Sequence, residues 1–462
     1  MFDLNEMHNN PKGKVLFATQ YADQGVCTGQ LQALIDECAQ QGGGQVRLTA
    51  GVYLTATLEL KSHVELYLDA GAVIRGVDDC SQYRNRYWEV TGKSTENFFA
   101  TPRWYDALVC AYDQENIAIR GHGIIDGSDC YDENGEQNFR GPHGVFFFRC
   151  KYATVEGISV LRAGNYNTMY EECEHLSVTG VHIYGGQDAM RLAACNEVTV
   201  QYCDFRTGDD CVSGTRNRNV RIYDCKFNTP GGHTVLMGCI NLHMKRCKLW
   251  SQGEYPATFK TNKRYSNSWT GFAMLHDGDD PKEIVSDNWL LEDIEMENIE
   301  TIFRHDRSLY FQEGYAGRVV IDGIKAVNFI YPITLTGIEG DPLDFTLRNG
   351  TFVRRTDDSQ EDRSFLRADC IKSLTIDNVV VENAAEELAW VSNVEHVNIT
   401  DLKALKPATE GAVRMEDVRE KSLTTRPVQT TAELYVYDYV DSIYIPTDQT
   451  EELRGPLRWN RP

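Results

Sequence analysis

The sequence predicts an all-β fold, a right-handed parallel β-helix (β solenoid) with an N-terminal capping helix. The first observation is a repeat: Cys203, Cys225 and Cys247 are each 22 residues apart, in segments of similar pattern. The second is the make-up of the repeats, which are short alternating strand patterns separated by Gly, Asn and Asp turns. Coils of this kind cannot bury their apolar faces alone, and stacking them in parallel buries one continuous core.

The N-terminal part, residues 1–45, is expected to hold the capping helix. The stretch "TGQLQALIDECAQQGGG" (28–44) has Leu31, Leu34, Ile35 and Cys38 at helical spacing and ends in three glycines. Such a helix would cover the strand edges at the open end of the solenoid, which otherwise invite aggregation.

Residues 46–405 are the predicted β-helix domain, and residues 406–462 the C-terminal strands or cap. We interpret the cysteine ladder as small buried side chains rather than a metal site, because the chain has no C-x-x-C pair. The stretch "AELYVYDYVDSIYIP" (432–446) indicates one or two late strands, which either cap the solenoid or meet a partner chain.

The composition excludes several classes of partner. The 462 residues carry a net charge of -22, and such a surface repels nucleic acid and anionic lipid. No apolar run is long enough to cross a membrane. The start, "MFDLNEMHNNPKGKV", lacks the regions of a signal peptide, so we expect a cytoplasmic protein unless such a peptide has been removed. The 14 cysteines are then reduced thiols.

A 22-residue repeat stacks equivalent positions in adjacent coils, and here it brings carboxylates together. Asp188 lies 22 residues before Asp210 and His233 lies 23 after it, with Asp209 next to this column. A single Gly-Asp-Asp is usually a turn. Stacked carboxylates about 5 Å apart, however, repel each other unless water, a cation or a proton intervenes, so at least one should have a raised pKa. Because stability alone gives no reason to build such a cluster, we interpret it as catalytic.

Clustered carboxylates without evident metal ligands suit glycoside hydrolysis. One carboxylic acid protonates the leaving oxygen, and another carboxylate activates water or attacks the sugar. Calcium is the alternative, since it accepts several carboxylates, but His233 is a poor ligand for it. We therefore expect neither a metal nor a cofactor. The loop "LHDGDDPKE" (275–283) lacks the bidentate Glu of a calcium loop and is expected to be solvated.

These segments resemble glycoside hydrolase family 28, the polygalacturonase-like enzymes, over about residues 20 to 400. The stretch "IAIRGHGIIDG" (117–127) is similar to an early coil of that family. The family's four active-site motifs correspond here to Gly186-Gln187-Asp188, Gly208-Asp209-Asp210, Gly232-His233-Thr234 and Thr258-Phe259-Lys260.

The resemblance implies an inverting hydrolase. Asp209 would be the general acid, while Asp188 and Asp210 would position and deprotonate the water. His233 would support the protonation state of the acid, and Lys260 would bind substrate.

The fourth motif departs from the family, which has an arginine where this chain has Thr258. Threonine cannot grip a galacturonate carboxylate, so either Arg191 or Arg264 compensates, or the subsite takes a neutral sugar. The Gly-x-Asp form of the first motif is similar to the family's rhamnogalacturonan hydrolases. Weaker candidates for substrate contact are, by coil counting or position, His143, Tyr170, Tyr310 and Tyr315.

We therefore expect an inverting hydrolase of pectin-related oligosaccharides, of galacturonan or rhamnogalacturonan type, that acts on the ends of short imported chains. A long aromatic stretch, residues 84–107, is a candidate for a loop that blocks an open groove. Two alternatives stay open: a polysaccharide lyase, which needs an Arg or Lys base and commonly calcium, and a non-catalytic carbohydrate-binding solenoid. The expected partner is an oligosaccharide, and a homo-oligomer is left open.

Overall fold

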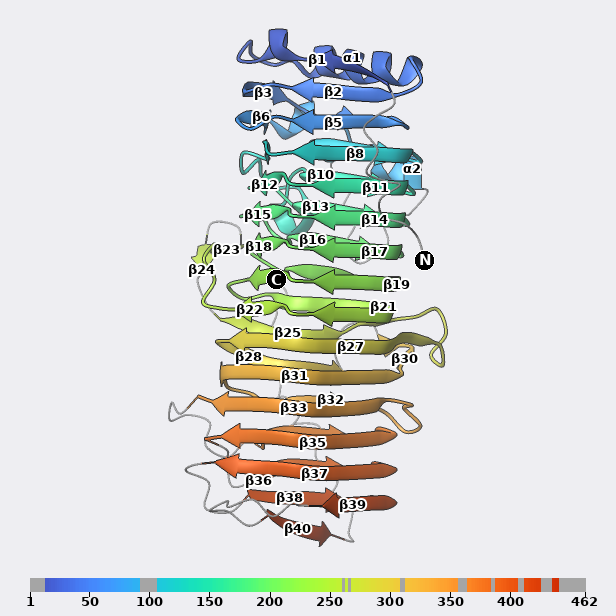
Figure 1. The fold of residues 1–462 in the computed structure, drawn as a ribbon, viewed down its shortest axis with the longest axis vertical. Helices are drawn as coiled ribbons and strands as arrows, with labels where there is room; N and C mark the ends of the chain where they lie inside the picture. The colour runs from blue at the N-terminus through green and yellow to red at the C-terminus, as the bar shows by residue number, and fades with distance from the viewer. Residues whose placement is uncertain are drawn as a thin grey trace.

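The structure, a computed structural model, describes residues 13–91, 106–259, 262–264, 267–307, 312–355, 364–383, 387–405, 411–424 and 434–439. The described strands form one elongated parallel β-helix, with its coils stacked along the long axis (Figure 1). The predicted fold class is therefore confirmed. No helix within these ranges is both long enough and apolar enough to span a membrane.

Each coil passes through three ladders of parallel strands, which we name A, B and C in chain order. Ladder A contains β1 (Lys14–Phe17), β2 (Gly44–Leu48), β5 (Val64–Leu68), β8 (Glu115–Gly121), β11 (Lys151–Glu156), β14 (Glu174–Thr179), β17 (Asn196–Gln201), the later parts of β19 (Val212–Tyr223) and β21 (His233–Lys245), then β27 (Ile284–Glu297), β31 (Arg318–Phe329), β33 (Asp344–Arg354), β35 (Ser373–Glu382), β37 (His396–Leu405) and β39 (Glu420–Thr424).

Ladder B contains β3 (Gly51–Thr55), β6 (Ala72–Gly76), β9 (Ile124–Asp126), β12 (Ser159–Leu161), β15 (His182–Tyr184), β18 (Asp204–Arg206), β20 (Lys226–Asn228) and β22 (Lys248–Trp250), and continues in the ends of the long strands from β27 onward. Ladder C contains β4 (Leu58–Glu59), β7 (Val109–Tyr112), β10 (Val145–Phe148), β13 (Thr168–Glu171), β16 (Met190–Ala193), the first parts of β19 and β21, then β25 (Ser268–Met274), β28 (Ile299–Asp306), β32 (Ile333–Thr336), β34 (Leu366–Asp369), β36 (Glu387–Ser392), β38 (Gly411–Glu416) and β40 (Leu434–Tyr439). We call the turn from ladder B into ladder C the B–C turn.

The shorter elements lie in the turns and insertions. They are η1 (Thr19–Tyr21), η2 (Cys80–Gln82), α2 (Tyr87–Thr91), η3 (Glu136–Asn138), the antiparallel pair β23 (Ala257–Phe259) and β24 (Asn262–Arg264), and the short strands β26 (His276–Asp277), β29 (Gln312–Glu313) and β30 (Tyr315–Ala316). Strand β40 is a late strand of the kind predicted within residues 432–446, whose other residues lie outside the described ranges. The predicted domain boundaries stay predictions.

Helix α1 (Thr28–Gln40) caps the N-terminal end of the solenoid, as predicted. Its buried side chains are Leu31, Ile35 and Cys38. The side chain of Gln32 accepts a hydrogen bond from the backbone N–H of Glu59 and donates one to the carbonyl of the same residue. The helix therefore satisfies backbone groups of β4 that would otherwise form an unpaired strand edge.

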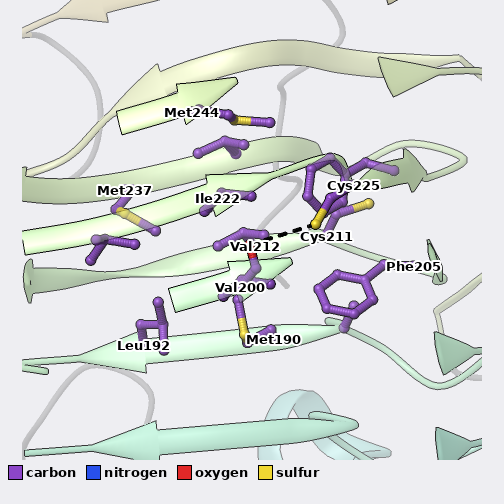
Figure 2. Packing of buried hydrophobic residues seen from close by; sticks show 14 of the residues in the cluster. Met190, Leu192, Val200, Phe205, Cys211, Val212, Ile222, Cys225, Met237 and Met244 are labelled. Atoms are coloured by element: carbon purple, nitrogen blue, oxygen red, sulfur yellow. Dashed lines mark hydrogen bonds between the residues drawn. The ribbon is translucent and has the colours of Figure 1, made fainter. Parts of the chain in front are cut away.

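Alternate side chains of each ladder point into the solenoid, as the period of two along a strand requires. Figure 2 shows this interior where Val200, Ile222 and Met244 stack in adjacent coils. The thiol of Cys225 lies in the same layer and donates to the carbonyl of Val200 at 3.8 Å. All but two of the described cysteines are buried, so the cysteine ladder consists of small core side chains, as predicted.

A chain of asparagine side chains holds the turns between ladders C and A in register. Asn219 donates to Asn196 at 2.9 Å, Asn241 to Asn219 at 2.8 Å, and Asn288 to Asn241 at 3.0 Å. The three donors have φ of 55°, 64° and 52°, a region that Asn tolerates better than most residues. These bonds tie each coil to the next and keep the turns between ladders C and A in register.

Candidate active site

One column of side chains follows from the register of ladder C. Strand β16 pairs with β19 in a step of 22 residues, and β19 pairs with β21 in a step of 23 residues. Two residues before these paired positions lie Asp188, Asp210 and His233, so they occupy equivalent places in three adjacent B–C turns. The stacking expected from the sequence spacing is confirmed. Toward the N-terminus the column continues with Tyr166 and then His143.

Hydrogen bonds fix the orientation of the column. The backbone N–H of His233 donates to Oδ1 of Asp210 at 2.7 Å, and the ring Nδ1 lies 3.2 Å from the same oxygen. The hydroxyl of Ser213 donates to Oδ2 of Asp188 at 2.9 Å. The side chains of Asp188, Asp209 and Asp210 are 7%, 16% and 11% exposed, so Asp209 is the most accessible of the three.

The close approach of these turns requires glycine at two positions. A Cβ on Gly208 would lie 2.6 Å from the carbonyl oxygen of Gly186, and one on Gly232 would lie 2.6 Å from the carbonyl carbon of Asp209. Both contacts are with backbone, which cannot move aside without separating the coils. The glycines that precede Asp209 and His233 therefore permit the carboxylates and the imidazole to stack.

An arginine that the sequence analysis did not single out joins the carboxylates. Nη1 of Arg140 donates to Oδ1 of Asp188 at 3.2 Å, and Nη2 donates to Oδ2 of Asp209 at 2.8 Å. Arg140 is 2% exposed and belongs to the insertion of residues 127–144, between β9 and β10. A cation therefore does lie between the carboxylates, and the chain itself supplies it.

Arg140 is held by its own insertion and by the next B–C turn. Its Nη1 also donates to Oδ1 of Asn165 at 3.0 Å, and its Nε donates to Oε1 of Gln137 at 3.2 Å. Asn165 in turn donates to Oε2 of Glu136 at 2.9 Å. The guanidinium lies 5.5 Å from the centre of the Tyr166 ring, within reach of a cation–π contact. These contacts define one position for the guanidinium.

Burial raises the pKa values of several carboxyl groups here. It raises the pKa of Asp188 to about 6; Arg140 opposes this shift and Asp210 adds to it. Burial, followed by the charges of Asp188 and Asp210, raises the pKa of Asp209 well above its ordinary value, although Arg140 opposes it. Burial also raises the pKa of Glu136. The cluster can therefore keep a proton near neutral pH, as a general acid must.

Two other predicted residues are Arg191, which lies beside the column, and His143, which lies at the N-terminal end of the column. Arg191 is on the outward face of ladder C, with its guanidinium 5.7 Å from the centre of the Tyr166 ring. His143 stacks on Tyr166 at 5.4 Å with an interplanar angle of 12°, and it is 1% exposed. Burial, together with Arg140 and Arg191, lowers the pKa of His143 to about 3. His143 therefore supports Tyr166 as a neutral ring and does not line an open surface.

Two predicted substrate contacts lie elsewhere. Tyr170 points into the solenoid and is 0% exposed, with its ring 5.6 Å from that of Phe147. Its expected stacking on a sugar ring is therefore wrong, because the alternation of β13 turns it inward. Tyr315 lies in β30, which pairs with the start of β27 at the turn from ladder C into ladder A, beside Arg307. That turn is at the opposite end of the ladder C strands from the carboxylates.

The fourth motif is described only in part. Lys260 lies outside the described residues, as does Tyr310. Thr258 and Arg264 belong to the antiparallel pair β23 and β24. Their expected roles stay predictions.

The outward face of ladder C is covered on the N-terminal side of the carboxylates. The hydroxyl of Tyr87, in α2, donates to Oε2 of Glu171 at 2.9 Å, and its ring lies 5.8 Å from that of Phe146. The apolar cluster at this place consists of Tyr87, Ala107, Cys110, Tyr112, Phe146, Phe148, Tyr166 and Met169, with Trp88 and Val90 packed against it. From the stretch 84–107, the cluster includes Tyr87 and Ala107. Residues 92–105 of that stretch lie outside the described ranges.

Within the described ranges, no three or more His, Cys, Asp or Glu residues are grouped so as to hold a metal ion. In the loop 275–283, Asp279 forms an ion pair with Arg216 at 2.7 Å, and Asp277 lies 3.5 Å from the same guanidinium. These two carboxylates are thus paired with a cation of the chain.

The comparison with family models matches the coils that carry the column. The family model for glycosyl hydrolases family 28 matches residues 86–246, which include Arg140, the three aspartates and His233. The endo-polygalacturonase of Pectobacterium parmentieri is 24% identical over 275 residues, which are 52% of this chain and 66% of that protein. The exo-poly-alpha-D-galacturonosidase of Dickeya chrysanthemi is 33% identical over 133 residues, which are 26% of this chain and 22% of that protein. The chain thus spans less than two thirds of the length of these curated relatives.

Solved structures show the same fold. The family 28 exopolygalacturonase of Yersinia enterocolitica has a TM-score of 0.50 at 14% identity, covering 94% of this chain and 79% of that chain. The surface adhesin PfbA of Streptococcus pneumoniae also has a TM-score of 0.50, at 13% identity, covering 90% of this chain and 93% of that chain. Because an enzyme and an adhesin share this fold, the fold alone does not indicate a function. The family is therefore judged from the sequence matches. On those matches, the chain is similar to glycosyl hydrolases family 28 and to its polygalacturonases.

Proposed function

We propose that the protein is a polygalacturonase-type hydrolase that cleaves pectic galacturonan or a related pectin-derived chain with inversion of configuration. The observation that carries the proposal is the column of Asp188, Asp210 and His233, with Asp209 beside it, inside the region that the family model matches. Three clustered carboxyl groups on a rigid scaffold, of which Asp188 and Asp209 have raised pKa values, suit acid–base cleavage of a glycosidic bond.

The contacts support distinct roles for the carboxyl groups. Asp209 is the most exposed and its pKa is raised well above the ordinary value, so it is the proposed acid. Arg140 bonds to its Oδ2, and the proton for the leaving oxygen would come from Oδ1. Asp188 and Asp210 each accept a hydrogen bond that fixes the carboxylate, which suits groups that hold and deprotonate a water.

The proposal includes action at a chain end. The apolar cluster around α2 covers ladder C on one side of the carboxylates, and this cover would stop a polymer that continued in that direction. We also propose that substrates are short imported chains and that the enzyme is cytoplasmic, a setting that suits the thiol-rich core. Cell fractionation tests the location, and light scattering tests whether a homo-oligomer forms.

Arg191 is the proposed contact for a galacturonate carboxylate. It lies on the outward face of ladder C beside Tyr166, one coil from the acid. An acidic protein needs such local positive charge to bind a polyanion. A neutral sugar at the site is the alternative, and substrate preference decides between them.

A lyase mechanism needs an arginine or lysine that gives up its proton. Burial opposes the charged form of Arg140, but Glu136 and Asp188 outweigh it and raise the pKa of Arg140 above its ordinary value. Arg140 is therefore a poor base. Ultraviolet absorbance of an unsaturated product, with and without a chelator, tests for a lyase, since hydrolysis gives none.

The experiment that tests the function compares the wild type with Asp209→Asn on galacturonan and rhamnogalacturonan oligosaccharides, with products and anomers followed by NMR. We expect a loss on the order of 10²–10⁴-fold in kcat for the variant, because proton transfer by one positioned group contributes that much. A matched control is Asp224→Asn, which removes a partly exposed carboxylate that is paired with Arg246 away from the column. Equal release by wild type and Asp209→Asn would refute the assignment of the acid, and binding without turnover by the wild type would support a non-catalytic solenoid.

A further inference from the structure

We infer that Arg140 is a fixed internal cation that sets the pH range of the reaction by bonding at once to the acid and to a water-holding carboxylate. This inference rests on the proposed function. It makes Arg140 a positioning residue, which acts through Asp188 and Asp209 and not through the substrate.

The first support is that all three guanidinium nitrogens are engaged. Nε bonds to Gln137, Nη1 to Asn165 and Asp188, and Nη2 to Asp209, over distances of 2.8 to 3.2 Å. The side chain is 2% exposed. Releasing it to grip a substrate would break these bonds and leave buried carboxylates without their partner, which is costly.

The second support is the balance of charge around the guanidinium. The titratable and charged groups that face the cluster come from the insertion, the B–C turns, ladder C and α2: Glu136, Arg140, His143, Tyr166, Asp188, Arg191, Asp209, Asp210, His233 and Tyr87. Four of these groups are carboxyls. Arg140 contacts two of them directly, so its charge acts on the acid and on the base at the shortest distances.

Arg140 should therefore shift the pKa values of Asp188 and Asp209 in the same direction. A cation in contact with a carboxyl lowers its pKa, typically by about 1–3 units, and Arg140 opposes the raised pKa of both Asp188 and Asp209. The acid limb of the pH–rate profile reports the base, and the alkaline limb reports the acid. Removing the positive charge should therefore move both limbs to higher pH together. Damage to the structure alone would lower the profile without moving it.

The test compares two substitutions that separate charge from shape. Arg140→Gln keeps a donor without the charge, and Arg140→Lys keeps the charge without the planar fork. Arg246→Gln is the matched control, because it removes the same charge from an exposed pair with Asp224. The measurement is kcat/KM against pH on the substrate that the wild type cleaves.

We expect Arg140→Gln to move both limbs up by about 1 pH unit, in line with a contact charge on a carboxyl. Arg140→Lys should lower kcat but move the limbs by less than about half of that, because a positive charge remains. Arg246→Gln should leave the profile in place. Unmoved limbs in Arg140→Gln, equal shifts in the Gln and Lys variants, or a change in KM alone would overturn the inference.

A second measurement needs neither activity nor the Gln variant. The guanidinium NMR signals of Arg140 in the wild type, assigned by their loss in Arg140→Lys, should respond to pH as Asp188 and Asp209 titrate. Signals that stay constant through the carboxyl titrations would refute the inference even in a fully active enzyme. If the signals titrate but no oligosaccharide is cleaved, the internal cation stands and the proposed hydrolysis fails.

Discussion

Replacing Asp188 by Asn is expected to stabilise the protein at neutral pH while it removes the proposed hydrolytic activity. The carboxyl of Asp188 is 7% exposed and lies in a column with Asp210. Asn keeps the size of the side chain and an oxygen that can accept the hydrogen bond from Ser213. The substitution therefore removes a buried charge with little change in packing.

The magnitude follows from the raised pKa. Burial raises the pKa of Asp188 from 3.8 to about 6, and a shift of about 2 units corresponds to about 3 kcal/mol against the ionised form at pH 7. Asn also weakens the bond to Arg140, which keeps Asp209 as a partner. We therefore expect a net gain of about 1–3 kcal/mol in the free energy of unfolding, below the full electrostatic value.

The pH dependence of stability shows whether the buried charge of Asp188 causes the gain in Asp188→Asn. The folded-state pKa lies above the unfolded one, so the stability of the wild type falls as pH rises from about 4 to about 6 and is constant beyond that interval. The advantage of Asp188→Asn should be absent near pH 4 and complete above about pH 6. Urea unfolding followed by tryptophan fluorescence at pH 4, 5, 6 and 7 measures it.

In the control, Asp224→Asn, the expected change in stability has the opposite sign. A hydrogen bond from Arg246 lowers the pKa of Asp224, so Asp224→Asn should destabilise the protein at pH 7 and lose its effect as pH falls through the lowered pKa. If Asp188→Asn is less stable than the wild type at pH 7, or if its effect does not change with pH, the electrostatic account of the site is wrong.

Two further predictions concern binding and packing. Arg191→Ala should raise KM for galacturonides about tenfold, equal to about 1.4 kcal/mol, with little change in kcat, and an unchanged KM would exclude Arg191 as the carboxylate contact. Tyr170→Ala should cost about 3–5 kcal/mol in stability, measured by urea unfolding, as for other large core side chains. Tyr170→Phe should retain both stability and activity, because the buried hydroxyl of Tyr170 has no hydrogen-bond partner in the described structure; lost activity in Tyr170→Phe would restore a role in the site.

The column could be predicted to the residue because a parallel solenoid converts spacing in the sequence into distance in space. Steps of 22 and 23 residues are the register of β16, β19 and β21, and so they align Asp188, Asp210 and His233. The same counting placed Tyr170 at the correct coil but on the wrong face. Tyr170 pairs with Leu192, an apolar core residue, and that parity was a signal in the sequence that it points inward.

Arg140 could not be predicted in this way, because it lies where the repeat is interrupted. The insertion of residues 127–144 carries it across an intervening turn to Asp188 and Asp209, a path that no fixed period describes. The one sign of Arg140 in the sequence was that stacked carboxylates need a cation, a proton or water between them. That need does not say which arginine supplies the charge.

The column and the insertion differ in how freely their residues can be replaced. The carboxylates belong to the B–C turns, which pack backbone to backbone at Gly208 and Gly232, so moving one of them disturbs its neighbours. The counter-charge belongs to an insertion, whose sequence is free of the repeat. Changes at Arg140 should therefore alter the pH range while the column keeps its geometry, whereas a side chain at Gly232 should abolish activity at every pH. A Gly232→Ala variant with wild-type turnover would show that the column does not depend on this close approach.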